Sequence, residues 1–253
     1  FTFLIRYKMK SKKIFFSIIT PVLNNPDIEN VFKCLNNQTY KNFEHIVVDG
    51  GSKRKTLNIL KKNKKKISKL IIEKDESLYE AINKGIRISK GNVIGILNSD
   101  DVYYSGTLKL VRNYFKKKNI DYIFGSVLKD RLMHGYWPKK IWYKFNVYPA
   151  HSCGFFVKKS AHKKLGLYDT NFKYSSDRDF IYRLLKSNFK GISSRKYEIF
   201  GKFNPNGISS KLSYIEDLNE SFRVRLKNQN FLLFLFVFFL TITNKIINLI
   251  FKR

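Results

Sequence analysis

The feature that most limits the folds open to this chain is a repeated alternation of short apolar runs with amphipathic helical patterns. Runs typical of buried strands recur at Phe15–Ile19, Phe43–Val48, Leu70–Ile72, Val93–Leu97 and Tyr122–Phe124. Between them, apolar residues recur at helical spacing, as they do from Ile28 to Leu35. Strands that alternate with helices build a mainly parallel sheet with helices on its faces. The pattern therefore predicts an α/β fold of the nucleotide-binding type, with a mostly parallel central sheet.

The composition limits the kind of partner. Of the 253 residues 43% are hydrophobic and 16% aromatic, which excludes a disordered protein, and the formal net charge is +30. Such a charge attracts nucleic acid, anionic lipid or phosphorylated substrates. The lysines are spread along the chain, and no RNA-recognition, zinc-finger or helix-turn-helix motif accompanies them. We therefore expect an anionic membrane surface, and not nucleic acid, as the macromolecular partner.

Changes in composition divide the chain into four segments. Residues 1–13 form a basic extension, within which Met9 is a candidate natural start that would make residues 1–8 non-native. Residues 14–128 carry the strand and helix alternation. Residues 129–212 are aromatic and irregular, with a predicted strand at Cys153–Val157 and a predicted helix at Phe180–Leu185. Residues 213–253 form a basic and apolar tail that we expect to be helical.

The tail contains the apolar run Phe231–Leu240, which Ile246–Phe251 nearly extends and which basic residues flank on both sides. A spanning helix needs about 20 apolar residues, and this run is shorter. The run predicts a membrane-embedded or interfacial helix, and the alternative is a terminal helix buried against the domain or a partner. Cys34 and Cys153 form no paired framework, which is typical of a reduced, cytoplasmic protein. We expect the chain at the cytoplasmic face of the cell membrane.

Polar residues follow three of the predicted strands. They are Thr20-Pro21, Asp49-Gly50-Gly51-Ser52 and Asn98-Ser99-Asp100-Asp101. In open α/β sheets ligands bind at the carboxyl ends of the strands, so these residues mark the expected site. Adjacent carboxylates repel each other unless a cation neutralises them, and their oxygens favour Mg²⁺ or Mn²⁺. The alternative is a set of turns, because Asn, Ser and Asp are also good turn residues.

At this point the chain resembles the family-2 glycosyltransferases, over about residues 16–210. The resemblance is carried by the order and spacing of several short runs: Ser17–Asn24, Gln38-Thr39-Tyr40, Ile46–Ser52, Glu73-Lys74-Asp75, Tyr79–Gly85 and Leu97–Asp101. It implies a GT-A type fold, a nucleotide-sugar donor that is most often a UDP-sugar, and inversion at the anomeric carbon. Residues 14–128 would then be the nucleotide-sugar-binding half and residues 129–212 the acceptor-side half.

The resemblance also implies roles for the residues at the strand ends. Thr20 and Pro21 would lie beside the nucleoside, and Asp49 would accept hydrogen bonds from the base or ribose, with Asp75 in the same pocket. Asn83 and Lys84 would hold the nucleotide or its loop, although the helix end alone also explains them.

The metal motif departs from the family's Asp-x-Asp pattern because Asn98 stands in place of the first acid. Asp100 is then the main ligand candidate for Mn²⁺ or Mg²⁺, with Asp101 as a helper. Asn98 and Ser99 would lie beside the donor, where the Asn98 carbonyl can orient a ribose or a metal-bound water.

The run Tyr174–Phe180 resembles the acidic acceptor motif of the family, and it makes Asp177 the candidate general base. The family pattern often has Glu before this Asp, whereas Ser176 stands here. The alternative is that Asp177 caps a helix. His151 matches a position near the acceptor or diphosphate, and residues 206–209 resemble a late loop that closes over the donor.

These observations predict a metal-dependent, inverting glycosyltransferase that adds one sugar to a glycan or lipid-linked acceptor in cell-surface polysaccharide synthesis. The Gln-x-x-Arg-Trp motif of processive synthases is absent from the sequence, which favours single-sugar transfer. A sugar nucleotidyltransferase would carry a Gly-rich, basic phosphate loop in the first turn, where this chain has Thr20–Asn25. A non-catalytic glycan- or membrane-binding module on a transferase fold is the other alternative, and Asn98 favours it.

Overall fold

The computed structural model describes residues 14–143, 148, 151–205, 207 and 213–250. Within this part the helices are α1 (Ile28–Asn36), α2 (Arg54–Lys62), α3 (Leu78–Ile88), α4 (Thr107–Lys117), α5 (His151–Gly154), α6 (Lys159–Leu165), α7 (Ser176–Lys186), α8 (Tyr214–Asn228) and α9 (Phe231–Ile250), with 3₁₀ turns η1 (Lys64–Lys66) and η2 (Pro138–Lys140). The strands are β1 (Phe16–Val22), β2 (Phe43–Asp49), β3 (Lys69–Ile72), β4 (Val93–Ile96), β5 (Val102–Tyr103), β6 (Tyr122–Phe124), β7 (Ser126–Leu128), β8 (Leu132–Met133), β9 (Phe155–Lys158), β10 (Gly191–Ser193) and β11 (Ile199–Lys202).

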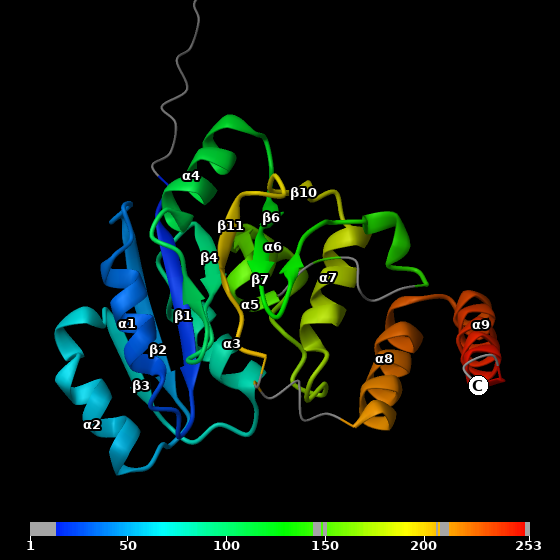
Figure 1. Ribbon diagram of the computed structural model, residues 1–253, viewed down its shortest axis with the longest axis horizontal. Coiled ribbons are helices and arrows are strands. Elements are labelled where there is room, and N and C mark those ends of the chain that lie inside the picture. The colour runs from blue at the N-terminus through cyan, green and yellow to red at the C-terminus, as the bar shows by residue number, and fades with distance from the viewer. Residues whose placement is uncertain (1–13, 144–147, 149–150, 206, 208–212, 251–253) are drawn as a thin grey trace, which may run out of the picture.

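A seven-stranded sheet forms the centre, in the order β10-β6-β9-β4-β1-β2-β3. All neighbouring strands are parallel except β9, which runs antiparallel to β4 and to β6. The predicted α/β fold with a mostly parallel sheet is therefore confirmed. A small second sheet, in the order β5-β11-β7-β8, packs beside it (Figure 1).

Helices cover both faces of the central sheet. On one face, apolar side chains of α1, α2 and α4 form a continuous core with β1 and with Phe200 of the small sheet. On the other face, α3, α6 and α7 pack their buried side chains against Ile19, Ile46 and Phe124. This two-sided burial explains the nearly unbroken apolar runs in the central strands, because neither face of such a strand meets water.

The first strand extends past its predicted end. Thr20 and Pro21 do not close β1 but lie within it, opposite Val47 and Val48 of β2. Strand β4 pairs with β1 only as far as Ile19, so beyond that residue β1 has a strand neighbour on one side only. Proline is tolerated where a strand has a free side, because its missing N–H then breaks no ladder hydrogen bond.

The strand predicted at Cys153–Val157 is wrong in its first half. Residues His151–Gly154 form the short helix α5, and β9 begins at Phe155. The helical turn places the Ser152 hydroxyl where it accepts a 3.1 Å hydrogen bond from the Asn98 N–H at the end of β4. Gly154 fits closely against Val127, where an added Cβ would lie 2.7 Å from a side-chain methyl. A local apolar run could not reveal these long-range contacts.

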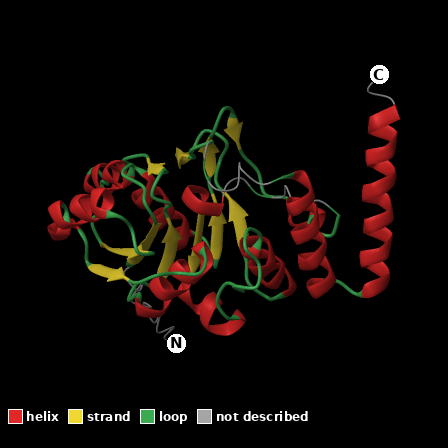
Figure 2. Ribbon diagram, turned by 90° about the horizontal axis from the view of Figure 1, so that it is seen from below, coloured by secondary structure: helices red, strands yellow, loops and turns green. Residues whose placement is uncertain are grey.

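The C-terminal helices lie at one end of the molecule (Figures 1 and 2). Helix α8 begins with a capping box between Ser213 and Glu216 and buries Val224 against the core. Helix α9 contacts α8 through aromatic rings, with the centroids of Phe222 and Phe238 4.8 Å apart. No helix within the described residues combines the length and the apolar character needed to cross a bilayer.

Candidate active site

The ends of β1 and β2 carry the first group of predicted site residues. Asp49 is the last residue of β2, and its Oδ1 accepts hydrogen bonds from the N–H groups of Gly51 (3.1 Å) and Ser52 (2.8 Å). Its Oδ2 is buried and has no hydrogen-bond partner among the described residues. A buried carboxylate oxygen is costly unless a donor reaches it, so this oxygen is a ready acceptor for a ligand N–H or O–H.

Asn24 fixes the turn beside Asp49. It is the one non-glycine residue with positive φ in the described chain (52°), a conformation that asparagine tolerates better than most residues. Its N–H donates to the Ser52 Oγ (2.8 Å), and its Oδ1 accepts from the Lys53 N–H (2.7 Å). These two hydrogen bonds join the loop after β1 to the loop after β2, beside Asp49. Asn24 belongs to the run Ser17–Asn24 that carries the family resemblance. Its contacts with Ser52 and Lys53 could not be predicted from the sequence, because they join two separate loops.

Thr20 is turned into the core. Its Oγ1 lies 3.0 Å from Nε2 of His45, a ring that is buried and edge-on to Phe32. Burial lowers the pKa of His45 to about 3, so the ring is neutral at physiological pH. The Thr20 hydroxyl is therefore occupied by its contact with His45. Contact with the nucleoside, as predicted for Thr20 and Pro21, would have to come from the Thr20 backbone and from Pro21.

Asp75 lies against the Asp49–Gly50 turn, because a Cβ added to Gly50 would be 3.3 Å from Asp75 Oδ2. Its Oδ1 is 2.7 Å from Nζ of Lys84. Burial raises the pKa of the Asp75 carboxyl, and Lys84 partly offsets this rise. The hydrogen bond to Asp75 raises the pKa of Lys84 and keeps this lysine charged. The structure thus brings Asp49, Asp75 and Lys84 to one place, as the sequence predicts.

Asn83 is used elsewhere. Its Nδ2 donates to the carbonyl oxygen of Tyr168 (2.8 Å), and its Oδ1 accepts from the Tyr168 N–H (3.0 Å). Both ends of the amide are therefore occupied by one backbone unit, and the residue is buried. Of the two roles expected for Asn83, to hold the nucleotide or to hold a loop, the structure shows the second, because Asn83 fixes the loop before α7.

The acidic cluster follows β4. Asn98 N–H donates to Ser152, and Ser99 Oγ accepts a 3.0 Å hydrogen bond from Asn25 Nδ2. Asp101 is 1% exposed, and its Oδ1 accepts from the N–H of Asn204 (2.9 Å). Its Oδ2 is buried beside Ser152 without a well-formed hydrogen bond. Burial raises the pKa of Asp101 to about 7 and also raises the pKa of Asp100.

The residues at this cluster fit a hard divalent cation. Two adjacent carboxylates with burial-raised pKa values, one with an unsatisfied oxygen, favour a positive neighbour. Among the described residues no group of three His, Cys, Asp or Glu side chains could hold a metal by itself. A cation at Asp100 and Asp101 would therefore need further oxygen ligands, such as the phosphates and waters that Mg²⁺ usually keeps.

A segment far along the chain closes over the acidic cluster. Asn204 Nδ2 lies 3.4 Å from Asp100 Oδ2, and a Cβ on Gly207 would lie 3.5 Å from the same oxygen. Gly207 belongs to the run predicted to form the closing loop, and the other residues of 206–209 lie outside the described part. The side chain of His151 also lies outside it. Sequence reasoning missed Asn204 because 103 residues separate it from Asp101.

Asp177 lies in the first turn of α7, between two tyrosines. Its Oδ1 accepts a hydrogen bond from the Tyr79 hydroxyl (3.0 Å), and its Oδ2 accepts from the Tyr148 hydroxyl (3.3 Å). Ser175 occupies the N-cap position without a capping hydrogen bond from its side chain, and Asp177 is the second residue of the helix, so the alternative prediction that Asp177 is the N-cap is wrong. The half-buried carboxylate faces side chains from α3 and from the acceptor-side segment. This is a suitable position for a base that takes a proton from a bound hydroxyl.

Comparison with known proteins identifies the architecture. Two rickettsial relatives, both named uncharacterized glycosyltransferases, are 30% identical over 67% of this chain (Rickettsia typhi) and 28% identical over 86% (Rickettsia prowazekii). These alignments span 58% and 74% of the relatives' own lengths. The crystal structure of S. aureus TarS 1-349 covers 83% of this chain and 64% of its own, with a TM-score of 0.65 and 18% identity.

A second solved structure has the same fold. The mannosyltransferase PcManGT from Pyrobaculum calidifontis, in complex with GDP-Man and Mn²⁺, gives a TM-score of 0.66 at 15% identity, over 87% of this chain and 66% of its own. The profile of the family described as Glycosyl transferase family 2 matches residues 17–197, which include both acidic strand ends and Asp177. The chain belongs to glycosyl transferase family 2, and its fold is the GT-A type of glycosyltransferases.

Proposed function

We propose that this chain transfers one sugar from a nucleotide-sugar donor, expected to be a UDP-sugar, to a hydroxyl of a glycan or lipid-linked acceptor. One observation carries the proposal: one buried carboxylate oxygen of Asp49, at the end of β2, and one of Asp101, in the loop after β4, have no well-formed hydrogen bond among the described residues. Strands β2 and β4 lie on the two sides of β1. Solved structures of the same fold carry UDP-GlcNAc or GDP-Man with Mn²⁺, and a 28% identical relative from Mycobacterium bovis is named a PGL/p-HBAD biosynthesis glycosyltransferase.

The donor would lie across the ends of β1, β2 and β4. Asp49 Oδ2 would accept an N–H of the base, as a carboxylate can from uracil. Asp100 and Asp101 would hold Mn²⁺ or Mg²⁺, which supplies positive charge to the departing diphosphate. Asn204 and the backbone at Gly207 lie over these carboxylates and would limit the access of water to them.

The transfer itself would be a displacement with inversion. The acceptor oxygen forms a bond to the anomeric carbon while the bond from that carbon to the diphosphate oxygen breaks. The nucleoside diphosphate leaves with the electron pair of that bond. Asp177 takes the proton of the acceptor hydroxyl, and its two tyrosine partners hold the carboxylate in place.

The first test is the binding of UDP, measured by calorimetry with and without Mn²⁺. We expect UDP to bind more tightly with Mn²⁺ in the wild type, and we expect this increase to disappear in Asp100→Ala. A failure to bind UDP, GDP or dTDP under any metal condition would exclude the transferase function and favour the binding-module alternative.

The second half of this test separates donor binding from chemistry. Asp177→Asn keeps the size of the side chain and one acceptor oxygen for the tyrosines, but it removes the base. We expect unchanged UDP affinity and a fall in sugar transfer by a factor of about 10²–10⁴. Equal turnover in the variant would exclude Asp177 as the base while leaving the donor site intact.

We further propose that the chain works at the cytoplasmic face of the cell membrane, against anionic lipid. Two features support this: the net charge of +30 and the apolar side chains exposed on α9. An acceptor linked to lipid would be presented at the same surface.

A further inference from the structure

Asp177 is contacted by two phenol groups from different parts of the chain. Tyr79, on α3, reaches Oδ1, and Tyr148, in the acceptor-side segment, reaches Oδ2. Each carboxylate oxygen therefore accepts one hydrogen bond, which fixes the plane of the carboxylate. Burial raises the pKa of both tyrosines well above their usual value, so both remain donors at physiological pH.

The Tyr79 hydroxyl has a second acceptor at an equal distance. Its oxygen is 3.0 Å from Asp177 Oδ1 and also 3.0 Å from the carbonyl oxygen of Tyr174. A hydroxyl has one proton and two lone pairs, and the proton rotates toward the better acceptor. When Asp177 is ionised, the proton points to the carboxylate. When Asp177 is protonated, the proton can point to Tyr174, and a lone pair of the hydroxyl can then accept from the carboxyl.

We propose that Tyr79 and Tyr148 are positioning residues for the base, and that Tyr79 hydrogen-bonds Asp177 in both of its protonation states. The inference rests on the role proposed for Asp177. A base that gains a proton during the reaction would otherwise lose a hydrogen bond at the moment of transfer. With Tyr79 present, the carboxyl keeps its orientation before and after the acceptor hydroxyl gives up its proton.

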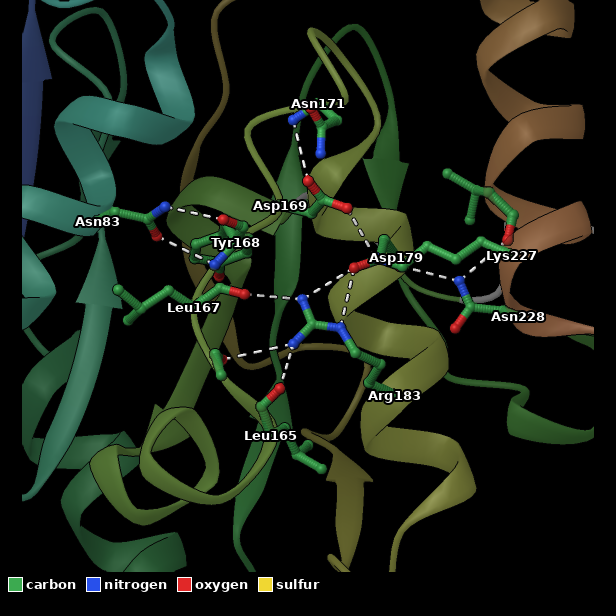
Figure 3. A network of polar contacts seen from close by, with 12 residues as sticks. Asn83, Leu165, Leu167, Tyr168, Asp169, Asn171, Asp179, Arg183, Lys227 and Asn228 are labelled. Atoms are coloured by element: carbon green, nitrogen blue, oxygen red, sulfur yellow. Dashed lines mark hydrogen bonds and ion pairs between the residues drawn. The ribbon is translucent and has the colours of Figure 1, made fainter.

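The surroundings hold Tyr79 in place. Its ring lies against Tyr168, with 5.6 Å between the ring centroids. The backbone of Tyr168 is held by the two hydrogen bonds of Asn83, and Arg183 donates to the carbonyl oxygens of Leu165 (2.6 Å) and Leu167 (2.8 Å) in the same loop (Figure 3). Figure 3 shows this loop fixed between α3 on one side and α7 on the other. Asn83 thus supports the base indirectly.

The other groups that influence Asp177 are few among the described residues. Tyr168 lies behind Tyr79 and interacts electrostatically with the carboxylate. Arg178, the next residue on α7, supplies a positive charge and forms an ion pair with Asp217 of α8 (2.8 Å). Replacing a phenol by phenylalanine leaves all of these in place, so its effect reports on the lost hydrogen bond.

The experiment is a ¹³C NMR titration of the side-chain carboxyls in aspartate-labelled protein, with the Asp177 resonance assigned by its loss in Asp177→Asn. A hydrogen bond that favours the charged form lowers the pH at which a carboxyl takes up its proton. We expect the titration midpoint of this resonance to rise in Tyr148→Phe and to rise less in Tyr79→Phe, although the Tyr79 bond is the shorter one, because Tyr79 also hydrogen-bonds the protonated form. Tyr136→Phe is the matched control, because the Tyr136 hydroxyl bonds to that of Tyr122 at 2.6 Å.

Unchanged midpoints in both Tyr79→Phe and Tyr148→Phe would overturn the proposal, as would an equal rise in Tyr136→Phe. A rise in Tyr79→Phe as large as that in Tyr148→Phe would overturn the claim that Tyr79 bonds both protonation states. The titration needs neither donor nor acceptor, so its result is independent of the transfer assay. Shifted midpoints combined with full transfer activity in Asp177→Asn would instead exclude the proposed base role.

Discussion

At the scale of single residues, the acidic cluster after β4 retains a proton at a higher pH than ordinary carboxylates do, and the proposed metal ion would compete with that proton. Asp101 is almost fully enclosed, and burial raises its pKa to about 7. Its folded-state pKa lies above the ordinary value of 3.8, so the metal-free folded protein binds this proton more tightly than the unfolded chain does. The stability that follows is full below about pH 4 and is lost as the pH rises to about 7.

Asp101→Asn tests this effect of burial on stability. The amide cannot ionise, so we expect the metal-free variant to be more stable than the metal-free wild type at pH 8, by at most about 4 kcal/mol, and equally stable at pH 4. Thermal unfolding at both pH values, in the presence of a chelator, measures the difference. A variant that is less stable at pH 8 would show that the carboxylate is stabilised by its neighbours in spite of burial.

Part of the candidate site could be predicted from single residues of the sequence. Asp49 stands directly after an apolar run, and Asp100 and Asp101 follow another within four residues. Parallel strands bring such positions to one edge of the sheet. The loop that Asn83 holds could not be predicted, because a helix end carries no information about which loop will pack on it, and Tyr168 is 85 residues away. The tyrosine partners of Asp177 were missed for the same reason, since 98 residues separate Tyr79 from it.

At the scale of elements, a buried ionic network joins α7 to α8. Asp179, with no exposed side-chain surface, contacts Arg183 on its own helix through two nitrogens (2.8 and 2.9 Å). Its other oxygen contacts Lys227 (3.0 Å) and Asn228 (2.9 Å) at the end of α8 (Figure 3). Because Asp179 follows Asp177 by two residues, the network anchors the helix that carries the candidate base.

We expect Asp179→Ala to lower the free energy of unfolding by about 3 kcal/mol or more, because it leaves buried partners without their counter-charge. Asp217→Ala is the matched control, since Asp217 also joins α8 to α7, through Arg178, but at the surface. For this variant we expect a loss of about 1 kcal/mol or less. Urea unfolding of the two variants measures both values, and similar losses would contradict the distinction.

The alternation of strands and helices was predictable at this scale because each element is long enough to show its own period. The small sheet was not predictable. Strands β5 and β8 have two residues each, which is too short to show a period, and β11 pairs with β5 and β7, which lie far from it in the sequence. The antiparallel strand β9 was predicted only in part, because the turn of α5 ends within the same apolar run, at Gly154.

At the scale of the whole molecule, the net charge and the exposed apolar side chains bear on the proposed contact with a membrane. The chain carries a net charge of +30. Helix α9 lies at one end of the molecule (Figure 2). It exposes large apolar side chains. Leu232, Phe236 and Phe239 are 78%, 62% and 61% exposed, which makes them the side chains to replace in a test of membrane contact. Helix α8 should stay intact in that test, because Lys227 and Asn228 hold Asp179.

Replacing Leu232, Phe236 and Phe239 together by serine should weaken binding to vesicles that contain phosphatidylserine by at least about tenfold. Serine at Ile72 and Tyr197, which are equally exposed but lie on other elements, is the control and should leave binding unchanged. Sedimentation with vesicles at low and high salt measures both effects. Equal losses in the two variants would argue against α9 as the contact.

The contact of Asn204 with Asp101 also has a consequence for the order in which the protein is made. The carboxylates leave the ribosome about a hundred residues before the segment that covers them, because 103 positions separate the two partners. During synthesis the strand end is therefore open to the ions and nucleotides of the cell. Asn204 can cover the carboxylates only after translation has passed it, so the proposed cation would have access to them before the covering segment is made.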